Sequence, residues 1–88
     1  MESVLAILSR EAGKAFEKAG LDPVFGKVTP SNRPDLCEYQ CNGAMAAAKK
    51  YHRAPMEMAE EAVAVLHESG VFSDVQAVRP GFINLKVD

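Results

Sequence analysis

The spacing of hydrophobic residues predicts a long amphipathic helix at the start of the chain. Over Ser3–Ala19, apolar side chains recur at helical spacing and form one stripe, made of Val4, Leu5, Leu8, Ala12, Ala15, Phe16 and Ala19. Gly20 tolerates left-handed backbone geometry, which predicts a cap that folds Leu21 back onto Phe16. The stripe is expected to face the core of the domain.

Two further helices are expected in the middle of the chain. Asn42 is suited to cap the first of them, which contains Ala44, Met45, Ala47, Ala48 and Tyr51. The pair Ala54-Pro55 ends this helix and starts the next, with proline at the first helical position. The buried stripe of the third helix is Ala59, Ala62, Val63 and Leu66. Gly70 and Val71 are expected to repeat the earlier cap, with Val71 over Leu66.

The remaining apolar segments read as strands. A short β-branched strand is expected over Val24–Thr29, and a loop over Pro30–Leu36. Near the C-terminal end, Val75–Arg79 and Phe82–Val87 are expected to form a hairpin around Pro80-Gly81. In its second strand, Ile83, Leu85 and Val87 alternate with Phe82, Asn84 and Lys86. The aliphatic set must face the helices, which leaves a ring, an amide and an ammonium on the open face.

These elements define the predicted fold class, an α+β domain in the order α-β-α-α-β-β. About three helices are expected on one face of a small antiparallel sheet. The 88 residues suffice for one core, so residues 1–88 are expected to form a single domain. No secretory signal or membrane-length apolar run is present in the sequence. The expected setting is therefore the cytoplasm, with no membrane partner.

The cysteines and the catalytic motifs add no chemistry to this picture. Cys37 and Cys41 are too few for a disulfide framework, and His52 and His67 do not complete a zinc-finger spacing. Two reduced thiols without a metal are therefore favoured. Motifs for phosphate-binding loops, serine hydrolases and zinc proteases are absent from the sequence. No catalytic residue is predicted.

Charge is distributed unevenly along the chain, although the net charge is only −2. Residues 27–53 hold five bases and two acids, whereas residues 54–70 hold four acids and no base. A phosphate backbone is attracted to the first of these segments and repelled by the second. Lys49, Lys50 and Arg53 are also explained as the favourable last turn of a helix. On charge alone, this second interpretation is favoured.

The open face of the last strand carries groups that suit unpaired RNA bases. Phe82 offers a ring for stacking, Asn84 a donor and an acceptor for a base edge, and Lys86 a phosphate contact. Two alternatives remain: the same face can receive a protein surface, or Phe82 can be a partly covered core ring. DNA is not expected as a partner.

Two blocks of the sequence are similar to one known family. Residues 38–50 (EYQCNGAMAAAKK) and 80–85 (PGFINL) resemble the N-terminal additional domain of arginyl-tRNA synthetases, and the similarity covers the whole chain in the same order. One position departs from the family pattern, because Cys37-Glu38 stands where that family usually has Gly-Asp. Glu38 preserves the acid, whereas Cys37 replaces a residue that tolerates positive φ.

The resemblance implies a domain that contacts the D-loop of tRNA(Arg) and is joined to the remainder of a synthetase chain. The family's aromatic and amide residues, which hold an exposed D-loop base, fall on Phe82 and Asn84. The surface argument adds Arg79, Lys86, Gln40, Asn42, Lys49 and Lys50 as candidate tRNA-binding residues. Gln40 and Asn42 are also suited to satisfy backbone groups at the helix start.

The resemblance also implies that the binding of ATP and arginine belongs to another domain. The class I motifs that bind ATP, His-x-Gly-His and a Lys-Met-Ser-Lys-Ser-like loop, do not occur in the sequence. This domain is therefore expected to hold no cofactor, since ATP and arginine bind the catalytic domain of such an enzyme. The chain is expected to be one domain of a longer arginine–tRNA ligase. Two other functions stay open: a free-standing protein-interaction or regulatory module, and an autonomous RNA binder.

Overall fold

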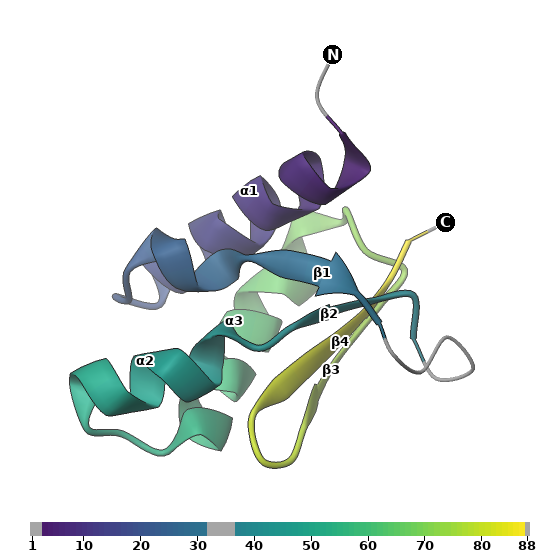
Figure 1. The fold of residues 1–88 in the computed structure, drawn as a ribbon. Coiled ribbons are helices and arrows are strands. Elements are labelled where there is room, and N and C mark those ends of the chain that lie inside the picture. The colour runs from purple at the N-terminus through teal and green to yellow at the C-terminus, as the bar shows by residue number, and fades with distance from the viewer. Residues whose placement is uncertain (1–2, 32–36, 88) are drawn as a thin grey trace.

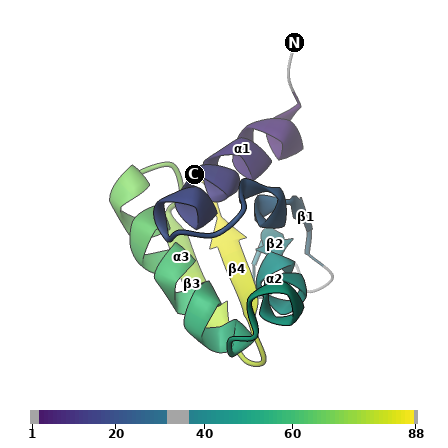
Figure 2. The same ribbon diagram turned by 90° about the vertical axis from the view of Figure 1, so that its left-hand side faces the viewer.

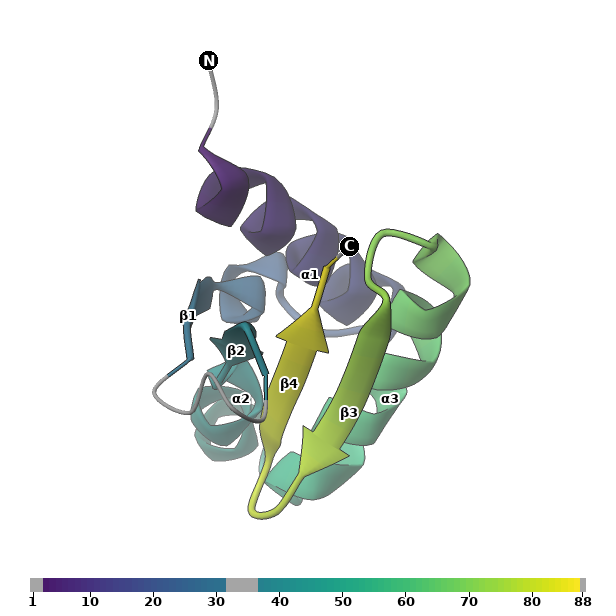
Figure 3. The same cartoon turned by 90° about the vertical axis from the view of Figure 1, so that its right-hand side faces the viewer.

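Three helices cover one face of a four-stranded antiparallel sheet in the computed structural model, which describes residues 3–31 and 37–87 (Figure 1). The helices are α1 (Val4–Lys18), α2 (Gly43–Tyr51) and α3 (Pro55–Ser69), and a short 3-10 helix, η1, spans Pro23–Gly26. The strands are β1 (Val28–Pro30), β2 (Tyr39–Cys41), β3 (Asp74–Val78) and β4 (Phe82–Lys86). Figures 2 and 3 show opposite sides of the molecule, with the helices in front of the sheet in the former and behind it in the latter.

The strand order β1-β2-β4-β3 confirms the predicted α+β class and the predicted order of helices and strands. One strand, β2, lies between β1 and α2 and was not predicted. Its three residues are too few to show an alternating pattern. It is a strand because it pairs with β1 on one side and with β4 on the other, which satisfies its backbone groups.

The strand expected over Val24–Thr29 is wrong in its first half, which forms η1. The Asp22 carboxylate accepts a hydrogen bond from the Val24 amide at 2.9 Å, and Pro23 occupies the first helical turn. This side-chain cap and the fixed φ of proline favour a helical turn over an extended segment. The strand begins at Val28 and includes Pro30. Most of the loop expected over Pro30–Leu36 lies outside the described residues.

The cap predicted at the end of α1 is confirmed. The Leu21 amide donates to the Phe16 carbonyl at 2.8 Å and the Gly20 amide donates to the Glu17 carbonyl at 3.0 Å, which is the Schellman pattern. Gly20 has φ +85° and Leu21 is buried in the same core cluster as Phe16. Local sequence therefore ends this helix and returns the chain to the core.

Two other predicted caps differ from the structure. Gly70 is left-handed at the end of α3, but the Val71 amide donates to Ser69 Oγ at 3.3 Å and the Val71 side chain is 37% exposed. The predicted packing of Val71 over Leu66 is therefore wrong. Asn42 occupies the N-cap position of α2 but makes no side-chain capping bond. Its carbonyl accepts from the Met45 amide at 3.1 Å instead.

The core lies between the helices and the inner face of the sheet. Its largest fully buried side chains include Phe16, Met58, Leu66, Ile83 and Leu85. Ile83 and Leu85 come from β4, as the alternation in that strand predicted. Val4, at the outer end of the predicted α1 stripe, is 54% exposed and lies outside the core. In the part of the chain that the structure describes, no helix is long and apolar enough to cross a membrane.

Candidate nucleic-acid interface

The outer face of the sheet is open to solvent, as Figure 3 shows for β4 and β3. Phe82 and Asn84 are half-buried on this face, and Lys86 is exposed, while the residues between them point into the core. Side chains two residues apart on one strand face are about 7 Å apart. The structure therefore presents the ring, the amide and the ammonium in one line along β4.

A row of polar side chains crosses the open face at the level of Asn84. The register pairs Asn84 with Gln40 of β2 and with Gln76 of β3, and Gln40 in turn with Thr29 of β1. Gln40 Nε2 donates to Asn84 Oδ1 at 3.2 Å. This amide nitrogen of Gln40 is therefore directed at β4 and not at the start of α2. This bond uses the acceptor of the Asn84 amide and leaves its two N–H donors available to a ligand.

Gln76 and Thr29 belong to this surface although the sequence did not single them out. Thr29 Oγ1 donates to the Gln40 carbonyl at 3.4 Å. Gln76 is a polar residue between Val75 and Ala77, so the sequence already indicated that it alternates with apolar neighbours. In the structure it is exposed, whereas Val75 is buried and Ala77 is half-buried. What the sequence did not show was the register, which places Gln76 directly opposite Asn84.

The two ends of β4 differ in character. At one end, Phe82 lies opposite Val78, which is 38% exposed, and the exposed Arg79 follows in the turn. At the other end, Lys86 lies opposite Asp74. The Glu38 carboxylate accepts a hydrogen bond from the amide of Val87 at 2.7 Å, immediately beyond Lys86. The Lys86 end therefore has acidic residues in its neighbourhood, whereas the Phe82 end is apolar and basic.

Lys49 and Lys50 are not brought together with Phe82 and Asn84. They lie in the last turn of α2, on the helical side of the molecule, away from the open sheet face (Figure 1). Lys50 Nζ lies 3.2 Å from Asp22 Oδ2 and 5.4 Å from the centre of the Tyr51 ring. Its bond to Asp22 raises the pKa of Lys50. The pKa of Asp22 is lowered, first by the Val24 amide and then by Lys50.

Arg53 is likewise engaged within the domain. Its guanidinium pairs with Glu57, and its Nη2 lies 2.6 Å from Glu61 Oε2, so the turn between α2 and α3 is tied to α3. The bonds to Glu61 and Glu57 raise the pKa of Arg53. Two of the five bases in residues 27–53, Lys50 and Arg53, therefore have internal acidic partners. Segment charge alone overstates the attraction of this part for phosphate.

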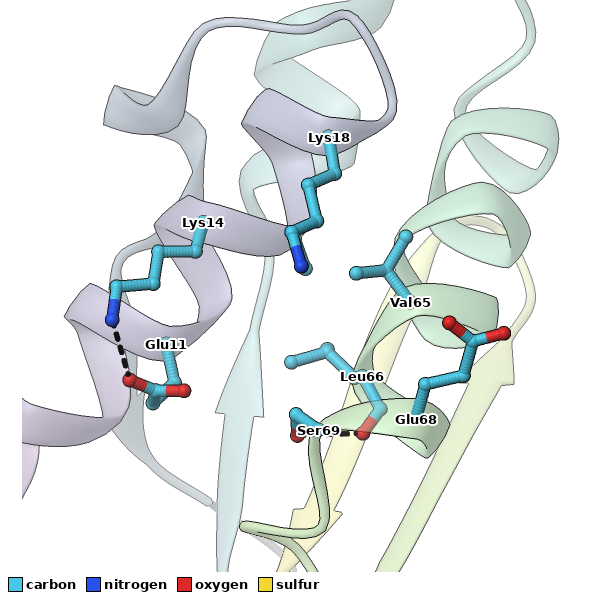
Figure 4. Close-up of a pocket in the computed structure, with 8 residues that line it drawn as sticks. Glu11, Lys14, Lys18, Val65, Leu66, Glu68 and Ser69 are labelled. Atoms are coloured by element: carbon cyan, nitrogen blue, oxygen red, sulfur yellow. Dashed lines mark hydrogen bonds and ion pairs between the residues drawn. The ribbon is translucent and has the colours of Figure 1, made fainter.

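A hollow between α1 and α3 is the alternative candidate site (Figure 4). Its polar lining mixes Lys14 and Lys18 with Glu11 and Glu68, and Lys14 pairs with Glu11 at 3.2 Å. No nucleophile with an adjacent base lies among these lining residues. The charges of opposite sign favour neither an anionic nor a cationic ligand.

The two thiols are buried and unlinked. Cys37 Sγ donates to Ser31 Oγ at 3.1 Å, and Cys41 Sγ donates to the Phe25 carbonyl at 3.3 Å. Burial raises the pKa of the Cys41 thiol from 9.0 to about 11. Within residues 3–31 and 37–87, no three His, Cys, Asp or Glu side chains gather as metal ligands would.

The raised pKa of Cys41 predicts a loss of stability at alkaline pH. The folded state favours the neutral thiol, so the stabilisation is complete below about pH 9 and is lost as the pH rises towards 11. A shift of this size corresponds to roughly 2–3 kcal/mol. Urea unfolding of the wild type and of Cys41→Ala at several pH values checks this. The difference between their unfolding free energies should shrink by about 2 kcal/mol between roughly pH 8.5 and 11. A difference that does not change with pH would contradict it.

The fold and the open face define a small α+β domain that carries its polar side chains on the uncovered side of a sheet. The chain belongs to the family described as the arginyl tRNA synthetase N terminal domain, whose model matches residues 2–87. It is 51% identical over its whole length to an arginine–tRNA ligase of Agathobacter rectalis and 41% identical over 99% of the chain to one of Alkaliphilus oremlandii. In each case it covers 15% of the relative.

A solved structure shows the same fold. The crystal structure of arginyl-tRNA synthetase from Plasmodium falciparum matches with a TM-score of 0.80 over 100% of this chain and 16% of that one. Sequence identity is 22%, so this likeness concerns the fold.

Proposed function

We propose that this chain is the tRNA-binding part of an arginine–tRNA ligase and that its open sheet face holds the D-loop of tRNA(Arg). The relatives that it matches carry the name arginine–tRNA ligase, and the chain spans about 15% of their length. ATP and arginine would bind elsewhere in such a ligase. The contribution of this domain is to hold the tRNA during ATP-dependent arginylation, without a cofactor of its own.

The observation that carries this proposal is the placement of Phe82 beside Asn84 on the uncovered face of β4. A half-buried ring supplies a rigid surface on which one unpaired base can stack. Asn84, two residues further along the strand, faces the same side and reaches the edge of a neighbouring or stacked base. Ring and amide on one strand face give both affinity and base selection.

The bond from Gln40 orients the Asn84 amide for this role. Because Gln40 Nε2 donates to Asn84 Oδ1, the amide is held in an orientation in which its N–H groups can donate to a ligand. Donors of this kind match the carbonyl oxygens and ring nitrogens on base edges. Gln40 therefore acts as a positioning residue, through Asn84.

The replacement Asn84→Asp tests this arrangement in the full-length protein. The carboxylate can still accept from Gln40 Nε2, but it has no donors for a base. The hydrogen bond to the base is lost, and the new carboxylate faces an acceptor atom on the base edge. Together these changes should weaken binding of a tRNA(Arg) transcript roughly tenfold. Binding is measured by titration of the transcript at constant salt.

Gln76→Glu is the matched control for this test. It adds the same negative charge to the same face, directly opposite Asn84, and leaves the Asn84 donors intact. We expect it to weaken binding by less than about threefold. Equal losses in the two variants would mean that charge alone is responsible. With transcripts that lack single D-loop bases, the effect of Asn84→Asp should vanish for one of them, and persistence in all of them would exclude the D-loop.

A further inference from the structure

The positive charges on the open face differ in their surroundings. Lys86 at one end of β4 has Asp74 opposite it and Glu38 at the next amide. Acidic residues in this neighbourhood reduce the attraction of this end for a phosphate. Besides Arg79 in the turn next to Phe82, a neighbouring strand can supply a second cation for the phosphate of the stacked base.

Lys27 is placed to supply that charge. It precedes β1, where Val28 is buried and Thr29 is exposed, so alternation puts Lys27 on the same side as Thr29. The register of Val28 with Cys41 brings Lys27 beside Asn42. Lys27, Thr29, Asn42 and Gly43 together line a hollow at this side of the sheet.

The lining of this hollow contains no carboxylate. Besides the four residues above, it consists of Val24, Phe25 and Ala46. Lys27 is exposed and pairs with no acid in the part of the chain that the structure describes. Its charge is therefore uncompensated, in contrast to those of Lys50 and Arg53.

We propose that Lys27 binds the RNA phosphate next to the base that stacks on Phe82, and that the hollow beside it receives this phosphate. This inference rests on the proposed function. β1 lies two strands from β4, a backbone separation of about 10 Å, which the long lysine side chain and one nucleotide with its flanking phosphate bridge. The Thr29 hydroxyl and the Asn42 amide lie in the same hollow as further neutral donors. The phosphate role expected of Lys86 falls to Lys27.

The test compares Lys27→Gln, Lys86→Gln and Lys18→Gln in the full-length protein, with Phe82→Ala as reference. The dissociation constant of an unmodified tRNA(Arg) transcript is measured from low to high salt. Loss of one phosphate contact lowers the slope of log affinity against log salt by about 0.7–0.9. When salt is raised from roughly 50 to 200 mM, the affinity of both proteins falls. The fold-decrease for Lys27→Gln should be about three times smaller than that for the wild type.

The other variants show whether a change in the slope is specific to Lys27. Lys18 is an exposed lysine in the last turn of α1, on the helical side, so its replacement controls for removal of one positive charge and should leave the slope unchanged. A slope change in Lys86→Gln equal to or larger than that in Lys27→Gln would overturn the inference. If Phe82→Ala weakens binding while Lys27→Gln keeps the wild-type slope, the inference fails and the proposed function survives. If neither variant affects binding, both fail.

Discussion

Replacement of Gly43 by alanine is expected to lower the free energy of unfolding by about 3 kcal/mol or more. A Cβ atom at this position would overlap the carbonyl oxygen of Phe25. The obstacle is backbone, which cannot turn away as a flexible side chain can. A domain of this length has roughly 4–13 kcal/mol of stability, so the loss is a large part of the total.

The surroundings of η1 explain why the strain is not relieved by a small movement. Phe25 and Gly26 belong to η1, which lies between α1 and the start of α2. A Cβ on Gly26 would overlap Gly13 of α1, so the backbones are already in close approach on that side. η1 therefore cannot retreat from a larger residue at position 43 without displacing α1.

Urea unfolding followed by far-UV circular dichroism measures this effect. Gly20→Ala is the control, because Gly20 has φ +85° and no atom within 4 Å of an added Cβ. Its cost is confined to left-handed backbone strain, about 1–2 kcal/mol. A loss in Gly43→Ala no larger than that in Gly20→Ala would show that the contact between η1 and α2 relaxes easily.

The second large effect is expected for Phe82→Ala in the full-length protein. Removal of the ring takes away the stacking surface of the open face, which is worth about 1–3 kcal/mol per base. Affinity for a tRNA(Arg) transcript should therefore fall roughly 5- to 150-fold. Because stacking tolerates any aromatic ring, Phe82→Tyr should retain most of the affinity.

Two controls separate loss of stacking from loss of folding. Phe82→Leu keeps apolar bulk beside Val78 but lacks a π face, so it should bind tRNA nearly as weakly as Phe82→Ala. Val4→Ala removes part of a side chain that is 54% exposed on α1, away from β4, and should bind as the wild type does. Unfolding curves confirm that each variant is folded. Wild-type affinity in a folded Phe82→Ala protein would remove Phe82 from the interface.

The sequence predicted those features of the fold that depend on residues close together in the chain. The Schellman cap at Gly20 depends only on residues 16–21, and the alternation of β4 follows from its own five residues. Phe82, Asn84 and Lys86 were therefore placed on one open face before any contact was known. The strand expected from Val24 was wrong because a capping contact from Asp22 outweighed β-propensity.

Long-range contacts decided the remainder. β2 is too short to be seen in the sequence, and its strand conformation comes from backbone pairing with β1 and β4. The bond between Gln40 and Asn84 joins residues 44 positions apart. The charge balance of the surface also differs from the one that the sequence suggests, because Lys50 pairs with Asp22 and Asp74 lies opposite Lys86.

The sequence by itself determined the helices, the cap at Gly20 and the face on which each side chain of β4 lies, because periodicity and turn chemistry act over a few residues. Tertiary structure alone decided which polar groups share that face, which cations remain uncompensated, and why Gly43 must lack a side chain. Each of these depends on the register and close approach of segments distant in the chain. Lys27 shows the difference: its charge is plain in the sequence, but its place beside Asn42 follows only from the pairing of β1 with β2.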